Sequence, residues 1–129
     1  MPFYNDDNLS IQGVAEAAVS KGQYVKQGTI ATNAQYVTPA GSTEVGIGYA
    51  AEDIAAAGVG RIIIAGIALA LAHDNGITGG STVLTSAASG RVDGTTTDKA
   101  WVCGHAISTA TAQDDLIEVL VTGYRLDNA

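Results

Sequence analysis

The run RIIIAGIALALAHDNGITGG, from Arg61 to Gly80, decides which fold class the chain adopts. Its eleven residues between Arg61 and His73 carry no charge, but a helix that crosses a bilayer needs about 20 apolar residues, so the run is too short for that role. From Gly66 onward, large and small residues alternate with a period of two, which is typical of a β-strand. The Asn-Gly pair at 75–76 then favours a tight turn. We therefore predict a strand that is buried on both faces, bends at Gly66 and ends at a turn.

Shorter pieces elsewhere repeat this pattern, with turn signals roughly every ten residues, which is typical of a barrel or a sandwich. The predicted fold is all-β and mainly antiparallel, with one short helix at Glu52–Gly58 that Gly58 caps. Residues 14–19 fit a strand and a helical turn equally well. The organisation we expect is an extended N-terminal arm at 1–10, one β-barrel or β-sandwich domain at 11–122 and a C-terminal tail at 123–129. The other predicted strands cover residues 23–26, 29–31, 34–37, 44–50, 81–85, 101–107 and 116–121.

Composition excludes several classes of partner. The chain has 129 residues, a net charge of −7 and only six basic residues, which are scattered along it. Binding to nucleic acid needs clustered lysine and arginine, so we expect no nucleic-acid partner. The single cysteine, Cys103, excludes an internal disulfide. The first ten residues show no signal-peptide pattern, and we expect no membrane partner.

Residues that carry chemistry are scarce. Cys103 and His105 would offer half of a zinc site, but no second pair follows with metal-site spacing, so a buried thiol beside an unrelated imidazole is the favoured interpretation. His73 and Asp74 would fit a hydrolase triad, yet no Gly-x-Ser-x-Gly motif supports one, and Asp74 is a good turn former. We therefore expect no enzyme activity, catalytic residue, cofactor or metal, and a structural or interaction protein instead.

Five short motifs follow one another in the second half of the chain: Gly66-Ile67-Ala68, Ile77-Thr78-Gly79-Gly80, Ser89-Gly90-Arg91-Val92, Gly104-His105-Ala106-Ile107-Ser108 and residues 117–121. Their order resembles that of the small capsid decoration, or cement, proteins of tailed bacteriophages. The similarity covers about residues 12–122 and is looser in the N-terminal half, where it rests on residues 19–25 followed by Gly28. The resemblance implies a barrel-like domain that forms a homotrimer and binds the major capsid protein on the outer surface of the expanded head. It implies neither catalytic residues nor a cofactor.

Within this interpretation, aromatic residues are the best candidates for contacts, because they dominate interface energetics. We predict that Phe3 and Tyr4 anchor the arm on the capsid, although an arm folded back on its own domain fits them equally well. Ile47, Tyr49 and Trp101 are the predicted trimer contacts. Two rival functions remain. One is a head-fibre or carbohydrate- or receptor-binding β module, for which Trp101 and Tyr124 are the available loop-adjacent aromatics, and the other is a small hydrolase using His73 or His105.

Overall fold

Nine strands and one turn of 3-10 helix make up the regular structure that this computed structural model describes over residues 8–29 and 35–127. The prediction of an all-β, mainly antiparallel fold is confirmed. Over the described ranges, no helix is long and apolar enough to span a bilayer. The elements are β1 (Asn8–Ala15), β2 (Tyr24–Gln27), β3 (Tyr36–Pro39), β4 (Gly48–Ala50), β5 (Val59–Leu71), β6 (Val83–Ser86), η1 (Ala88–Gly90), β7 (Val92–Gly94), β8 (Trp101–Ala106) and β9 (Leu116–Arg125).

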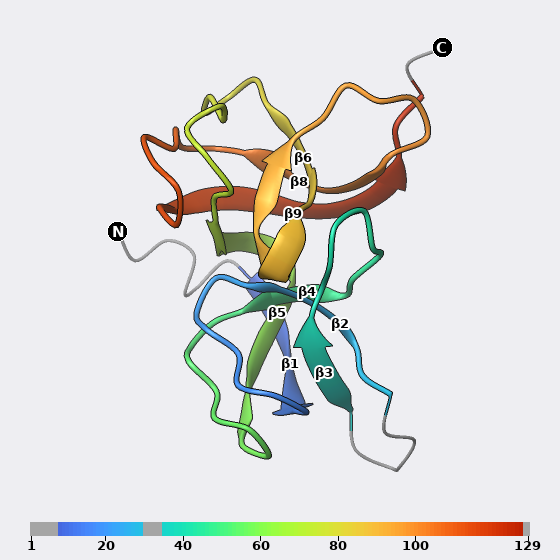
Figure 1. Ribbon diagram of the computed structural model, residues 1–129, viewed down its shortest axis with the longest axis vertical. Helices are drawn as coiled ribbons and strands as arrows, with labels where there is room; N and C mark the ends of the chain where they lie inside the picture. Colours follow the sequence, from blue (N-terminus) through green and yellow to red (C-terminus); the bar gives the residue numbers. More distant parts are fainter. Residues whose placement is uncertain (1–7, 30–34, 128–129) are drawn as a thin grey trace.

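The 13-residue strand β5 belongs to both halves of the molecule. Its first part closes a ring of five strands, in the order β1-β3-β2-β4-β5, because β1 pairs with β5 as well as with β3. Within this ring only β1 and β3 run parallel. Figure 1 shows the ring as the lower half of the molecule, in blue and green. A closed ring leaves none of these strands as an open edge.

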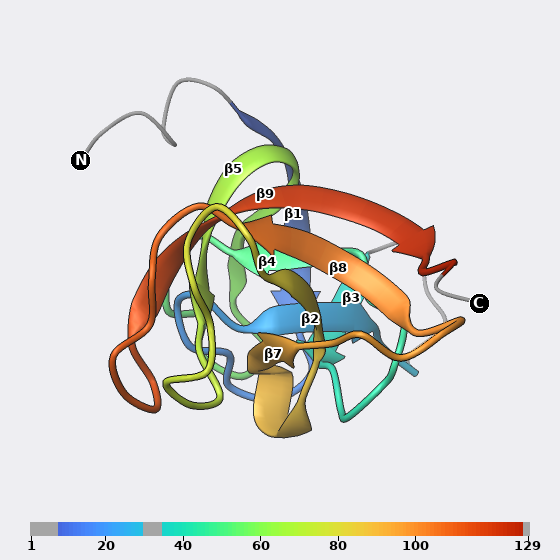
Figure 2. The same ribbon diagram turned by 90° about the horizontal axis from the view of Figure 1, so that it is seen from above.

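The second part of β5 builds the upper half. It pairs with β9, which pairs in turn with β8, then β6, then β7. An isolated parallel bridge between Ala72 and Val92 joins the end of β5 to the start of β7. Seen from above, β9 and β8 run side by side as curved strands (Figure 2). The upper half is thus also wrapped around its own core.

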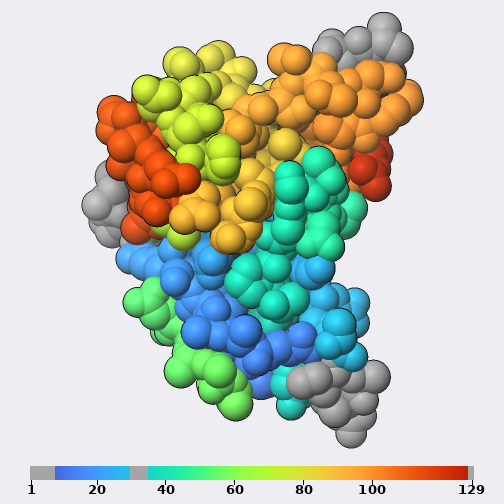
Figure 3. Space-filling view, viewed as in Figure 1, coloured from blue at the N-terminus to red at the C-terminus, as the bar shows by residue number. Residues whose placement is uncertain are grey.

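Each half has a core of its own. The lower one consists of small and β-branched residues such as Val25, Val37 and Ile62. The upper one contains Tyr49, Leu84 and Ile117 and continues along β5 through its alanines. Between the halves, the loop before β4 reaches up against β6, where the Ser86 hydroxyl donates to the Glu44 carbonyl at 2.8 Å. Figure 3 shows this loop, in teal, packed against the orange segments of the upper half.

Gly66 lies where β5 passes from one half to the other. It pairs with Asn8 on β1 and with Val121 on β9, and its φ is +91°, so the predicted bend at this residue is confirmed. A positive φ of this size is readily adopted by glycine and disfavoured for other residues. The glycine therefore lets one continuous strand serve both halves.

The predicted helix at Glu52–Gly58 is wrong. Ile54 instead forms an isolated bridge with Val19 and is buried in the lower core, and Ala57 adopts a φ of +65°, which is typical of a turn. Burial of Ile54 outweighs the weak helical preference of the neighbouring alanines. The helical turn of the described chain lies at η1. Strand pairing also reaches Asn8 and Arg125, inside the ranges expected as arm and tail.

Candidate functional site

The second part of β5 turns its large side chains outward and its small ones inward. Ala68, Ala70 and Ala72 are fully buried, whereas Ile67 and Leu69 are only half-buried. The prediction that this strand is buried on both faces is therefore wrong for its outer face. The reason is the neighbouring core, which is filled by larger residues from β6, β8 and β9 and leaves room for alanine alone.

Strand β9 continues the same apolar surface. Leu116 lies opposite Leu71, and Leu120 lies opposite Ile67, so each pair shares one face of the sheet. Leu116 is 44% exposed and Leu120 is 46% exposed, while the alternating Ile117 is buried. We call this surface the outer apolar face; it consists of Ile67, Leu69, Leu71, Leu116 and Leu120. Glu118 lies opposite Leu69, between Leu116 and Leu120, so this face is apolar apart from one carboxylate. Exposed apolar surface with polar groups beside it marks interaction sites.

Beyond Leu120, the face ends at a polar aromatic pair. His105 on β8 lies opposite Leu120, and its Nε2 lies 2.8 Å from the Tyr124 hydroxyl. Cys103 is fully buried in the upper core, and this burial raises the pKa of its thiol to about 11. Cys103 and His105 are therefore not brought together as half of a metal site. The interpretation of a buried thiol beside an unrelated imidazole agrees with this geometry.

The residues predicted as contacts lie in different environments. Tyr49 is fully buried and its hydroxyl donates to the Cys103 carbonyl at 2.7 Å, so its side chain offers no surface to a second copy. Ile47 is partly buried against the lower core. Phe3 and Tyr4 lie outside the described residues. The predicted trimer contact at Tyr49 therefore does not fit the structure, whereas the capsid contact at Phe3 and Tyr4 and the trimer contacts at Ile47 and Trp101 stay predictions.

Trp101 lies beside a polar cleft. Its indole Nε1 donates to the Tyr24 hydroxyl at 3.0 Å, and the Arg125 guanidinium lies 5.5 Å from the centre of its ring. The cleft has a volume of about 530 Å³, and its hydroxyl and charged groups could hydrogen-bond a small polar ligand. Its lining residues are Thr43, Thr85, Gly94, Thr95, Thr97, Asp98, Lys99, Ala100, Trp101 and Arg125.

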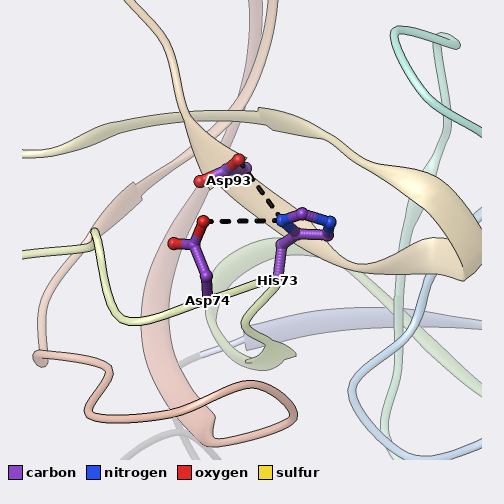
Figure 4. Close-up of side chains that lie close together, drawn as sticks. All are labelled: His73, Asp74 and Asp93. Atoms are coloured by element: carbon purple, nitrogen blue, oxygen red, sulfur yellow. Dashed lines mark ion pairs between the residues drawn. The ribbon is translucent and has the colours of Figure 1, made fainter.

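A further group of polar side chains lies just after the end of β5, where residues that are distant in sequence come together. His73 and Asp74 follow the bridge at Ala72, and β7 places Asp93 beside them (Figure 4). The prediction that Asp74 forms a turn is confirmed, because its Oδ1 accepts a hydrogen bond from the Gly76 amide at 2.8 Å. Sequence reasoning missed Asp93, since nothing in the spacing of the chain signals that β7 returns to this point.

Comparison with solved structures gives an informative likeness in fold. No family model and no curated protein matches the sequence. Among solved structures, the fold is similar to the crystal structure of the head fiber gp8.5 N base in bacteriophage phi29, with a TM-score of 0.73 and 16% sequence identity. The match covers 92% of this chain and 98% of that chain. At this identity the likeness shows a shared fold, and it extends over both halves built on β5.

Proposed function

We propose that the chain is a structural protein of a bacteriophage virion that binds the outer surface of the expanded head and stabilises contacts between capsomers of the major capsid protein. In this proposal it acts as a homotrimer and as a decoration, or cement, protein. It has no catalytic role, and neither nucleic acid nor a membrane is its partner.

The observation that carries the proposal is the extent of the fold likeness. The matched structure is the N base of a phage head fiber, and 98% of it corresponds to 92% of this chain. The likeness therefore involves the whole arrangement of strands, rather than a common sub-structure such as a single hairpin. It agrees with the independent resemblance of the sequence to phage decoration proteins.

The outer apolar face supports self-association. With 13 acidic and six basic residues, two copies of the chain repel each other over most of their surfaces. The paired segments 66–71 and 116–121 carry a single charged residue, Glu118, which lies opposite Leu69 on the outer apolar face. Burying the apolar side chains of this face would favour association, so we assign it to the contact between copies.

A trimer would strengthen attachment to the head. Each copy brings its own weak contact to the head. Once the first copy of a trimer is bound, the other two copies are held near the head surface at a high effective concentration. Binding a lattice that exists only after expansion also stabilises that state by mass action. We assign Phe3 and Tyr4 to the capsid contact in this scheme.

Light scattering followed by co-sedimentation tests the proposal. The wild-type chain should have a mass near three times 13.0 kDa and should pellet with expanded, undecorated heads but not with unexpanded ones. Leu120→Glu should give monomers, because it places a charge in the outer apolar face. Val59→Glu is the matched control: Val59 is also exposed, on the other part of β5, and the trimer should persist. A wild-type monomer that ignores heads would refute the proposal.

The capsid contact needs its own variant. The double change Phe3→Ala and Tyr4→Ala should leave the trimer intact and reduce the fraction that pellets with expanded heads. An unchanged pelleted fraction would assign attachment to another surface.

A head-fibre base, with or without a carbohydrate or receptor ligand, is the second candidate function, and the name of the matched structure favours it. The two functions differ in their effect on the head. A cement protein should raise the temperature at which expanded heads fall apart, whereas a fibre base should bind without that effect. Glycan binding that Trp101→Ala abolishes would favour a ligand-binding module, since Trp101 lines the polar cleft.

The hydrolase alternative requires that replacing His73 and His105 by alanine abolish the biological activity.

A further inference from the structure

The side chains of His73, Asp74 and Asp93 converge on one point at the surface of the upper half. His73 Nδ1 lies 3.6 Å from Asp74 Oδ2 and 3.5 Å from Asp93 Oδ2. The three potential ligand atoms all lie within 4.8 Å of one another. Figure 4 shows the imidazole nitrogen directed at both carboxylates.

These distances fit ligands around a shared cation better than they fit direct hydrogen bonds. Both exceed the usual range of about 2.7–3.2 Å for a hydrogen bond from nitrogen to oxygen. Ligand atoms about 2.1 Å from a tetrahedral zinc ion lie ~3.4 Å from each other. The separations of 3.5 and 3.6 Å are close to that value.

The imidazole nitrogen makes long ion-pair contacts to both of these carboxylates. His73 Nδ1 is a buried atom, and no hydrogen-bond partner is present for it among the described residues. Buried polar atoms are almost always satisfied, and an exception calls for an unseen ion or water. The rest of the cluster remains open, because the His73 and Asp93 side chains are 40% and 34% exposed, which leaves access for an ion and its water ligands.

The surroundings hold the two carboxylates in place. Asp93 Oδ1 accepts a hydrogen bond from the Gly94 amide at 2.8 Å, just as Asp74 Oδ1 does from Gly76. Each aspartate therefore keeps its other oxygen, Oδ2, directed at the imidazole. The His73 amide donates to the Val92 carbonyl at 2.8 Å, which fixes the spacing between the segment after β5 and strand β7. Such outer contacts orient ligands at metal sites.

We propose that His73 Nδ1, Asp74 Oδ2 and Asp93 Oδ2 bind a divalent transition-metal cation, with Zn²⁺ as the best match. One imidazole and two carboxylates suit a borderline ion such as zinc, whereas Ca²⁺ takes about six to eight oxygen ligands. The bound ion would tie the segment after β5 to β7, beside the bridge between Ala72 and Val92 that closes the upper half. Such a site is independent of the proposed role on the phage head.

Calorimetric titration of the metal-stripped, 129-residue chain with ZnCl₂ tests the site. We expect one ion per chain and a rise in melting temperature with zinc. His73→Gln and Asp93→Asn should each weaken binding by about tenfold or more. The asparagine at 93 can still accept the hydrogen bond from Gly94, so the variant should stay folded, as circular dichroism will check.

His105→Gln is the matched control, because His105 is the second histidine of the chain and lies on β8. Its zinc affinity should equal that of the wild type. Titration with Co²⁺ adds a spectroscopic readout, since visible absorption reports the ligand geometry around the ion. The proposal is overturned if zinc does not bind saturably, if His73→Gln binds zinc as tightly as the wild type, or if His105→Gln loses as much affinity as His73→Gln.

Discussion

Replacing Gly66 by alanine tests whether the bend of β5 is a requirement of the fold. Gly66 has a φ of +91° and is paired on one side with Asn8 and on the other with Val121. An alanine held at such an angle costs about 1–3 kcal/mol in backbone strain. The unfolded alanine chain has less freedom to lose, which returns about 0.4–1 kcal/mol. The expected net loss of unfolding free energy is therefore about 1–2 kcal/mol.

Urea denaturation at one fixed protein concentration measures this loss. A fixed concentration matters because association of copies adds to apparent stability. Gly66→Ala should lower the midpoint of unfolding without changing the dependence on urea, since a change in that slope would indicate altered compactness. The strain should also be visible as faster unfolding of the folded state.

Gly80→Ala is the comparison variant. Gly80 has a similar φ of +86° and lies outside the strands, and a Cβ added to it would meet no atom within 4 Å. The Gly80 amide donates to the Ala106 carbonyl at 2.8 Å, whereas Gly66 is paired with a strand on each side, so Gly80→Ala should cost less. A neutral or stabilising Gly66→Ala, or an equal loss in both variants, would refute the idea that the bend is imposed by pairing on both sides.

Three further predictions concern buried and charged groups. Tyr49→Phe removes the hydroxyl that donates to the Cys103 carbonyl, so it should lower the unfolding free energy by about 1–3 kcal/mol in urea denaturation and leave the oligomeric mass unchanged. Cys103, with a pKa raised to about 11 by burial, should resist a thiol reagent at pH 8 in the folded protein and react at once in urea. A hydrogen bond from Arg91 lowers the pKa of Asp114, and one from Lys26 lowers the pKa of Glu44. Both carboxylates therefore stabilise the fold at a pH above the pKa that they have in the unfolded chain. That contribution should be lost as the pH falls below about 4, and the urea midpoint should drop less steeply in a variant with Asp114→Asn and Glu44→Gln.

The fold class could be predicted because its signals are local. Alternation after Gly66, the glycine itself and the turn at Asp74–Gly76 are all readable within one segment, and each is confirmed. The helix at 52–58 failed because a distant partner decides its conformation: Ile54 pairs with Val19, and no local pattern reveals that pairing. The same limit applies to Asp93, which reaches His73 only because β7 folds back along the end of β5.

The outward direction of the large residues on β5 has a different origin. Alternation of large and small residues predicts a strand but does not say which set faces the core, since both sets here are apolar. The core is already filled by Leu84, Ile117 and Val119, so alanines are the residues that fit against it. Ile67 and the leucines are then left on the surface, where they cost solubility unless another surface covers them. The proposed association between copies would cover these outward leucines. The outer face of β5, which was predicted wrongly, and the proposed trimer contact therefore involve the same residues. If Leu120→Glu leaves the mass of the protein in solution unchanged, the outward leucines need an explanation other than self-association.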